Sequence, residues 1–393
     1  MLNPSQALTG TLLHKFGFAP VWFLAAMATP TTARFALPLL AVGTAIAAWR
    51  GELDLASDLD AIEWGLLVFA VVWIASAAYG LDPGRSFRLS IPMLAALTSL
   101  FVLRRQREAA LALMSFDAAL FLLGCWQCLQ LTRPLYAGLG GEAAVQQSDA
   151  MWLVEPNDIA WIAATWPPML AGASSRQRAL LAIPIALALV LMSLLGSRLA
   201  LIVSVLALAP MLARSPRKML GFAIVLSAAL ALAAWVLDPA IFAKGSASLA
   251  SRMQLWRAAG QVFYDWPWLG TGPHGFELAY KQYLPDGLAL DPRDTPWPHS
   301  LPLEIAAVTG LAGVFATGLL VFAAIVHCRT EPAPDAGRRR VLIVQCIVFA
   351  VLGLFEASFL RLWVWMLAIA ILGRLPRRVH DTQDHSLTKG GNR

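Results

Sequence analysis

Three observations predict an all-α fold, a polytopic membrane helical bundle with about twelve transmembrane helices and one large extracytoplasmic loop. They are the composition, the length of the apolar segments and the positions of the basic residues between them. Of the 393 residues, 58% are hydrophobic and only 14% are charged. Soluble domains contain about 25% charged and 45–50% apolar residues. The composition therefore favours one membrane bundle over two or three soluble domains.

The apolar segments define the expected helices in order. About 20 mostly apolar residues are needed to cross a hydrocarbon core of about 30 Å, and a shorter span can be tilted or broken. We expect spans one to nine in residues 1–237, a loop with short helices at 238–300, the last three spans in 301–373, and a cytoplasmic tail at 374–393. In chain order, the expected spans are 17–30, 35–49, 61–79, 89–103, 109–131, 151–172, 179–195, 198–213, 219–237, 301–327, 341–357 and 359–373.

The basic residues between these spans determine the expected orientation. If the N-terminus is cytoplasmic and the helices alternate, most of the 30 lysine and arginine residues fall in cytoplasmic segments, among them Arg338, Arg339 and Arg340. Cytoplasmic loops of membrane proteins carry such an excess, so both termini are predicted to be cytoplasmic. Topology therefore accounts for the net charge of +6, and no nucleic-acid partner is expected.

The four cysteines do not predict a metal centre. Cys125 and Cys128 form a C-x-x-C within an apolar segment, and Cys328 and Cys346 flank a loop expected on the cytoplasmic side. No second cysteine pair stands at ligand spacing, so we expect four unpaired membrane thiols. The N-terminal region lacks a small-residue cleavage site after a short apolar segment, so no removed signal peptide is expected.

The loop expected at residues 238–300 is long and rich in aromatic residues. It includes Trp256, Trp266 and Trp297 and a helix-like stretch at residues 247–264. Amphipathic rings settle at the membrane interface, and a long loop within a compact protein is usually functional. We therefore expect a structured cap at the interface.

Several arginines expected on the outer side could bind an anion. Arg198 lies between two apolar spans, where a guanidinium is costly without a partner or a wet cavity, so it either snorkels at a helix end or contacts an anion. Arginine suits phosphate because its planar fork donates two parallel hydrogen bonds and keeps its charge. The other outer arginines that could join such a basic site are Arg85, Arg88, Arg252 and Arg257.

Two segments near the end of the loop carry further candidates. A glycine-rich turn at residues 266–276 permits a tight backbone path, but it lacks the strand and helix of a nucleotide-binding motif. His299 then falls at the outer mouth of a span, where an imidazole could accept a proton from a sugar hydroxyl. Glu304 could orient that histidine or pair with an arginine. Gly310 and Gly313 would let another helix approach closely.

The segment from His299 to Gly313 resembles the H-[NSQ]-x9-G-x-x-G signature of O-antigen ligases. Those enzymes belong to a superfamily that also includes O-antigen polymerases and pilin O-oligosaccharyltransferases. Three further segments are similar to the family, namely residues 155–160, in which Glu155 replaces an asparagine, 196–198 and 252–272. The block that carries the resemblance runs from about residue 150 to 315, and the twelve-helix outline fits the whole chain.

The resemblance implies an inverting glycosyltransferase in the bacterial inner membrane. Such ligases move a finished glycan from undecaprenyl pyrophosphate to the lipid A core oligosaccharide, on the periplasmic face and without a nucleotide sugar or a metal. The implied partners are the lipid-linked donor, the lipid A core acceptor and membrane lipids, with no cofactor. The large loop is then periplasmic.

The resemblance also suggests roles for the candidate residues. Without a divalent cation, the charge that develops on the pyrophosphate must be met by fixed cations, for which we expect Arg198 and Arg252. His299 would act as the base or position the acceptor hydroxyl. The remaining substrate-binding candidates are Arg85, Arg88, Arg257 and Glu304.

Three other functions are compatible with parts of the sequence. A polymerase of the same superfamily would use the same donor but a second lipid-linked glycan as acceptor. A transporter could use helices broken at Pro167, Pro168 and Pro184, although no paired repeat supports it. An intramembrane serine protease would rely on Ser197 and His299, which twelve helices and the neighbouring arginine fit badly.

Overall fold

The protein is all-helical in the regions that its computed structural model describes. Apart from an isolated antiparallel bridge between Leu53 and Gln106, each regular element in these regions is a helix, which confirms the predicted class. The described residues are 36–54, 57–106, 113–114, 116–122, 125, 160–194, 198–212, 240–284, 297–330, 336–356 and 358–375.

The helices follow the order expected from the apolar segments. Of those described, α5, α6 and α15 are long and apolar enough to cross a membrane, and α4 and α11 contain shorter apolar stretches. The bounds are α4 (Ala36–Trp49), α5 (Ala61–Tyr79), α6 (Pro83–Arg105), α9 (Ala160–Gly172), α10 (Ser175–Leu194), α11 (Arg198–Leu212), α13 (Ala240–Asp265), α14 (Gly275–Ala279), the 3-10 helix η2 (Tyr280–Tyr283), α15 (Leu301–Thr330), α16 (Ala336–Phe355) and α17 (Leu362–Leu372).

Most expected spans coincide with described helices. The expected span at 61–79 matches α5 at both ends. The spans expected at 17–30 and 219–237, most of 109–131 and the first nine residues of 151–172 lie outside the described residues. The total of twelve therefore stays a prediction.

Capping interactions explain where α5 and α6 begin. Asp60 and Glu63 form a reciprocal capping box at the start of α5. The side chain of Asp82 accepts a hydrogen bond of 3.0 Å from the backbone N–H of Arg85, and Pro83 suits the first turn of a helix. Because of this cap α6 begins well before residue 89, where the span was expected, so Arg85 lies on the helix rather than in a loop.

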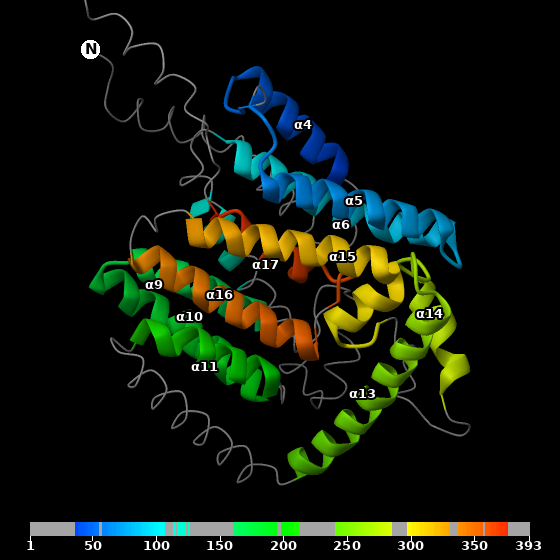
Figure 1. Ribbon diagram of the computed structural model, residues 1–393. Coiled ribbons are helices and arrows are strands. Elements are labelled where there is room, and N and C mark those ends of the chain that lie inside the picture. Colours follow the sequence, from blue (N-terminus) through cyan, green and yellow to red (C-terminus); the bar gives the residue numbers. More distant parts are fainter. Residues whose placement is uncertain are drawn as a thin grey trace, which may run out of the picture.

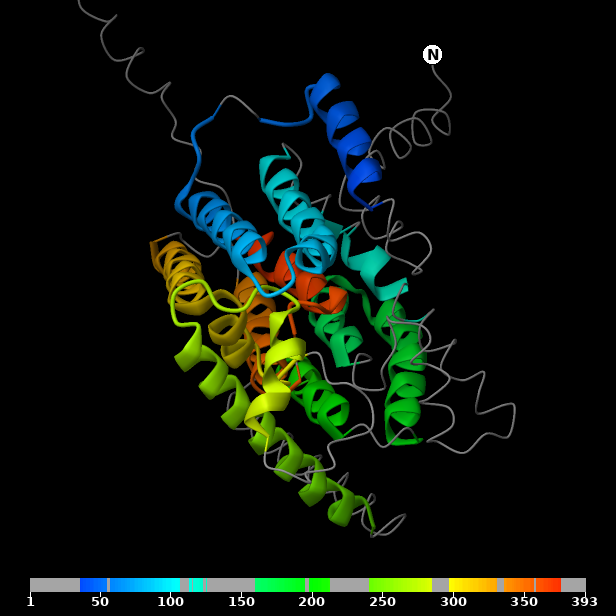
Figure 2. The ribbon, with the colours of Figure 1, turned by 90° about the vertical axis from the view of Figure 1, so that its right-hand side faces the viewer.

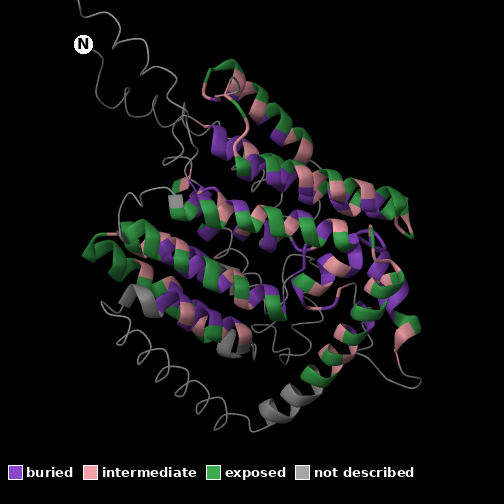
Figure 3. Ribbon diagram, in the orientation of Figure 1, coloured by how far each residue is buried: buried purple, intermediate pink, exposed green. Residues whose placement is uncertain are grey.

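Helices α5 and α15 pack against each other in opposite directions (Figure 1). Near the start of α5, the missing side chain of Gly65 leaves room for Leu320, because a Cβ on Gly65 would lie 3.2 Å from the Cα of Leu320. Near its end, the hydroxyl of Ser76 donates a hydrogen bond of 2.6 Å to the carbonyl of Val308. Buried residues line the facing sides of these helices, whereas many exposed residues on their outer sides are apolar (Figure 3).

The antiparallel packing gives the bundle two chemically distinct ends. We call them the His299 end, where α5 ends and α15 begins, and the Arg104 end, where α5 begins and α6 ends. At 1.5 Å per residue, α5 separates them by about 27 Å. The guanidinium of Arg104 donates to the carbonyls of Leu372 and Leu375, so α17 finishes at the Arg104 end and starts toward the His299 end. Helix α13 runs obliquely to α15 and α16 (Figures 1 and 2).

Helix α15 is broken at Gly310, where φ is 63° and ψ is −160°. The loop that follows α13 enters this break and supplies hydrogen bonds to backbone groups that the break leaves unpaired. Thr271 donates to the carbonyl of Ala307 at 3.0 Å, and the carbonyl of Pro267 accepts from Leu311 at 2.7 Å. Non-helical backbone at membrane depth requires such partners within the protein.

This break corrects the expectation that the two glycines receive another helix. A Cβ on Gly310 would lie 2.5 Å from the carbonyl carbon of Trp268, so the close partner is the backbone of the loop. A Cβ on Gly313 would lie 1.6 Å from the hydroxyl of Thr309, which belongs to α15 itself. The glycine-rich turn and the backbone around Gly310 are therefore hydrogen-bonded to each other, at residues 267–272 and 307–312. We call this contact the joint.

Candidate functional site

The candidate site is centred on Glu356, which lies in the loop directly after α16 and is 1% exposed. Nδ1 of His299 lies 3.4 Å from Oε1 of this carboxylate. Nη2 of Arg252, which α13 contributes, donates to Oε2 at 2.5 Å, and Nη1 of the same guanidinium donates to the carbonyl of Phe355. Two of the three predicted catalytic residues therefore meet at one carboxylate.

His299 has an unusual backbone conformation. Among the described residues it is the only residue other than glycine with a positive φ, at 53°. This conformation is rare for residues with a Cβ, and such strain clusters at functional sites. It aims the imidazole at Glu356 just before α15 begins at Leu301. The imidazole also meets the ring of Trp297 edge-on, with the ring centroids 5.9 Å apart.

Positive charge outweighs negative charge around Glu356. The guanidinium of Arg361 lies over the ring of Trp297, 4.8 Å from its centroid, and contributes to the field at Glu356. Burial raises the pKa of Glu356, but His299, Arg252 and Arg361 outweigh this effect and hold the pKa well below its usual value. Glu356 is therefore an ionised carboxylate that faces two guanidinium groups and one imidazole, each from a different segment.

Glu304 does not join this cluster. It is 1% exposed, and its two oxygens accept hydrogen bonds from the hydroxyl of Ser358 at 2.8 Å and the backbone N–H of Phe359 at 3.1 Å. It thereby fixes the loop between α16 and α17, which carries Glu356. The alternatives of orienting His299 or pairing with an arginine find no support in its described contacts.

The remaining arginine candidates lie apart from Glu356 or make few contacts. Nη2 of Arg85 lies 3.4 Å from Oε2 of Glu277, which is also 3.0 Å from Nδ1 of His274. Burial lowers the pKa of His274. Arg88 and Arg257 are exposed at the surface of α6 and α13. These arginines are accessible to a solute, but the described contacts do not connect them to the carboxylate at the candidate site.

Arg198 begins α11, as the sequence predicted, but its side chain lies outside the described part of the chain. Helix α11 packs against α16, the helix that leads to Glu356. Whether the Arg198 guanidinium reaches the same site stays a prediction.

Glu356 and Arg361 were not among the site residues expected from the sequence. Both stand as isolated charges between the apolar segments at 341–355 and 362–372. A charge held between apolar membrane segments costs free energy, and residues that carry such charges are often functional. This property was the signal in the sequence that could have identified both residues. The expected span at 341–357 includes Glu356, whereas α16 ends at Phe355 and leaves the carboxylate in a loop.

The apolar helices, the broken α15 and the buried charged cluster define a multi-pass membrane protein with a polar site at one end of its bundle. The family model described as O-antigen ligase matches residues 169–318, a segment that contains Arg198, Arg252 and His299. This match supports membership of the chain in the O-antigen ligase/polymerase superfamily and confirms the resemblance seen in the sequence. No curated protein matches the chain.

Proposed function

We propose that the chain is an inverting O-antigen ligase that transfers a glycan from undecaprenyl pyrophosphate to the lipid A core oligosaccharide. The observation that carries this proposal is the convergence of Arg252 and His299 on the buried Glu356. A fixed guanidinium beside an imidazole provides the two groups that the transfer needs, one for the diphosphate and one for the acceptor hydroxyl.

In the proposed reaction an acceptor hydroxyl attacks the anomeric carbon of the donor glycan from the side opposite the diphosphate. The new glycosidic C–O bond forms while the bond between the anomeric carbon and the diphosphate oxygen breaks. The electron pair of that bond leaves with undecaprenyl pyrophosphate, and Nε2 of His299 takes the hydroxyl proton. Arg252, with Arg198, stabilises the charge that develops on the leaving diphosphate.

The proposed location is the bacterial inner membrane, with the His299 end facing the periplasm. The basic residues Arg338, Arg339 and Arg340 support this orientation, because they lie at the start of α16 and Glu356 follows its end. A helix of 20 residues spans about 30 Å. Both termini are then cytoplasmic by the excess of basic residues on that side.

The exposed arginines have secondary roles in this proposal. Arg85, Arg88 and Arg257 attract the anionic donor toward the site, and their exposure makes this contribution sensitive to salt. Glu304 supports the site through the loop that it holds rather than through direct contact with the substrate.

The test is glycan transfer by purified protein in proteoliposomes, with an undecaprenyl-pyrophosphate-linked glycan as donor and lipid A core as acceptor. Replacing the imidazole in His299→Ala should lower kcat about 100-fold or more, because a general base typically contributes 10²- to 10⁴-fold. Arg176→Ala, an exposed change near the start of α10, is the matched control and should keep full activity.

Undiminished transfer by folded His299→Ala would overturn the proposed function. Product analysis addresses the polymerase alternative, which the family also covers. Lengthening of the lipid-linked glycan without any attachment to lipid A core would identify a polymerase rather than a ligase. Movement of the donor across the vesicle membrane with no covalent product would identify a transporter.

A further inference from the structure

A single buried carboxylate contacts both groups to which the proposed reaction gives direct roles. Oε1 of Glu356 lies 3.4 Å from Nδ1 of His299, and Oε2 accepts from Nη2 of Arg252 at 2.5 Å. Resting on the proposed function, we propose that Glu356 is a positioning residue that holds the base and the diphosphate-binding arginine in one fixed arrangement, with one oxygen for each.

The contact with Oε1 selects the form of the imidazole that can act as a base. A carboxylate facing Nδ1 favours the tautomer in which Nδ1 carries the proton, which leaves the lone pair of Nε2 to accept another. The His299 side chain is 20% exposed, so a substrate can reach it, whereas Glu356 is 1% exposed. Glu356 therefore acts on the acceptor hydroxyl only through His299.

The contact with Oε2 fixes the guanidinium of Arg252 but occupies only one of its N–H groups. Arginine has five N–H donors in a planar fork, and the described contacts of Arg252 direct Nη1 to the carbonyl of Phe355 and Nη2 to Glu356. Further donors are available for a diphosphate. Because the guanidinium is held in advance, less side-chain freedom is lost when the donor binds.

A purely structural role is a weaker explanation for Glu356. The loop that carries it is already fixed by Glu304, which accepts hydrogen bonds from Ser358 and Phe359. The groups that face Glu356 are instead Arg252 from α13, His299 ahead of α15 and Arg361 ahead of α17. Because two of these three groups, Arg252 and His299, have direct roles in the proposed reaction, the carboxylate serves their arrangement rather than the path of the loop.

The test compares Glu356→Gln with Glu356→Asp in the proteoliposome assay. The amide of glutamine keeps an acceptor for Arg252 but turns a donor toward Nδ1, which favours the imidazole tautomer that cannot accept a proton at Nε2. We expect Glu356→Gln to lower kcat about 100-fold, to change the donor KM by less than about threefold, and to abolish the rise of kcat with pH that an imidazole base gives. Glu356→Asp, which keeps the charge, should restore part of kcat and the pH dependence.

Two controls distinguish a specific effect of Glu356 on His299 from a general effect of the substitution. Glu52→Gln, a partly exposed residue at the Arg104 end, should behave as the unaltered protein. In the His299→Ala background, Glu356→Gln should cause no further loss of kcat, because the amide still accepts from Arg252 and the remaining effect of the carboxylate passes through the imidazole. The inference would be overturned, with the proposed function left intact, if folded Glu356→Gln kept an unchanged kcat and pH profile. If the glutamine variant fails to fold, full kcat in Glu356→Asp would have the same meaning. No transfer by the unaltered protein would instead overturn the proposed function.

Discussion

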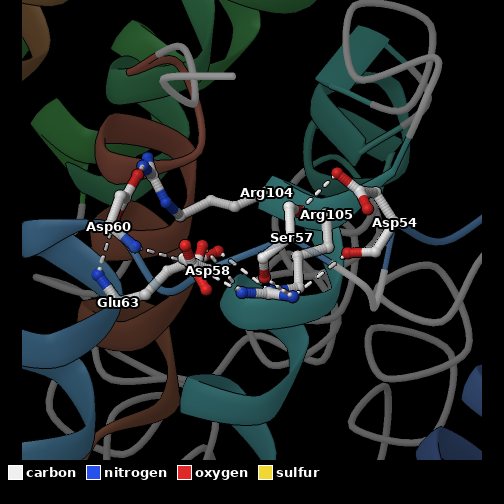
Figure 4. Close-up of polar contacts among 7 residues, drawn as sticks. All are labelled: Asp54, Ser57, Asp58, Asp60, Glu63, Arg104 and Arg105. Atoms are coloured by element: carbon white, nitrogen blue, oxygen red, sulfur yellow. Dashed lines mark hydrogen bonds and ion pairs between the residues drawn. The ribbon is translucent and has the colours of Figure 1, made fainter. Parts of the chain in front are cut away.

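The two ends of the bundle hold buried charges in different proportions. At the Arg104 end, Arg104 pairs with Asp60 and Arg105 pairs with Glu63 at 3.0 Å, with these four side chains at most 9% exposed (Figure 4). At the His299 end, the carboxylate of Glu356 faces the imidazole of His299 and the guanidinium groups of Arg252 and Arg361. Two of these, His299 and Arg252, are 20% and 21% exposed.

This difference separates a structural network from a candidate site. The guanidinium of Arg105 also donates to the carbonyls of Asp54 and Ser57, and that of Arg104 donates to carbonyls at the end of α17. These bonds join α6 to the chain before α5 and to α17, and little of the network is reachable from outside. A partly exposed cluster with excess positive charge is instead suited to an anionic substrate.

Removing one partner from the buried ion pairs at the Arg104 end should have the largest effect on stability. Glu63→Ala leaves the Arg105 guanidinium buried beside an empty position, and loss of one partner from a buried pair costs about 3–5 kcal/mol. We expect a large drop in the thermal unfolding temperature of detergent-purified protein. The surviving folded fraction should transfer glycan at the normal kcat.

The control for this change is Glu52→Ala, a partly exposed carboxylate at the same end. Surface substitutions usually stay within about 0.5 kcal/mol, so its unfolding temperature should hardly move. A normal unfolding temperature for Glu63→Ala would show that the pair is dispensable, and the distinction between the two ends would then fail.

The joint at Gly310 gives the next largest effect, on both stability and activity. Gly310→Ala places a Cβ at positive φ and 2.5 Å from the backbone of Trp268, so the loop must move. This combination of φ and ψ is essentially restricted to glycine and costs a residue with a Cβ about 1–3 kcal/mol, and we expect a total of about 2 kcal/mol or more. Transfer should fall as well, because the joint sets the position of the first segment of α15.

Gly318→Ala is the matched control in the same helix, because a Cβ at that position meets no atom within 4 Å. It should unfold at the normal temperature or slightly above, since alanine favours a helix over glycine by about 1 kcal/mol. Equal effects of the two substitutions would show that the break at Gly310 is not required.

Local patterns were sufficient to predict the helices and two members of the site. Apolar length identified α5, because its sequence is mostly apolar and ends at a polar turn. His299 and Arg252 were found because each stands in a recognisable segment of the superfamily. Gly310 was also singled out, but its consequence, a broken helix joined to a loop, depends on contacts with residues about 40 positions earlier.

Glu356 shows why the rest could not be predicted. It lies 104 residues from Arg252 along the chain, and the family match ends at residue 318. Only the packing of α13, α15 and α16 brings the two together, and apolar periodicity does not specify which helix ends meet. Glu304 shows the converse, because its closeness to His299 in the sequence suggested a contact, whereas its described hydrogen bonds go to the loop at Ser358.

The smallest expected effect concerns Arg85, and it tests whether the candidate site extends beyond Glu356. The Arg85 side chain is 48% exposed and pairs with Glu277 at 3.4 Å, so Arg85→Ala should change the unfolding temperature very little. If Arg85 attracts the donor, its removal should raise the donor KM roughly fivefold, equivalent to about 1 kcal/mol, with kcat unchanged. Glu277→Gln separates the two explanations, because it removes the partner but keeps the guanidinium. An increased KM in both variants would mean that the ion pair matters for local structure, whereas an increase in Arg85→Ala alone would extend the anion-binding surface from the His299 cluster to α6.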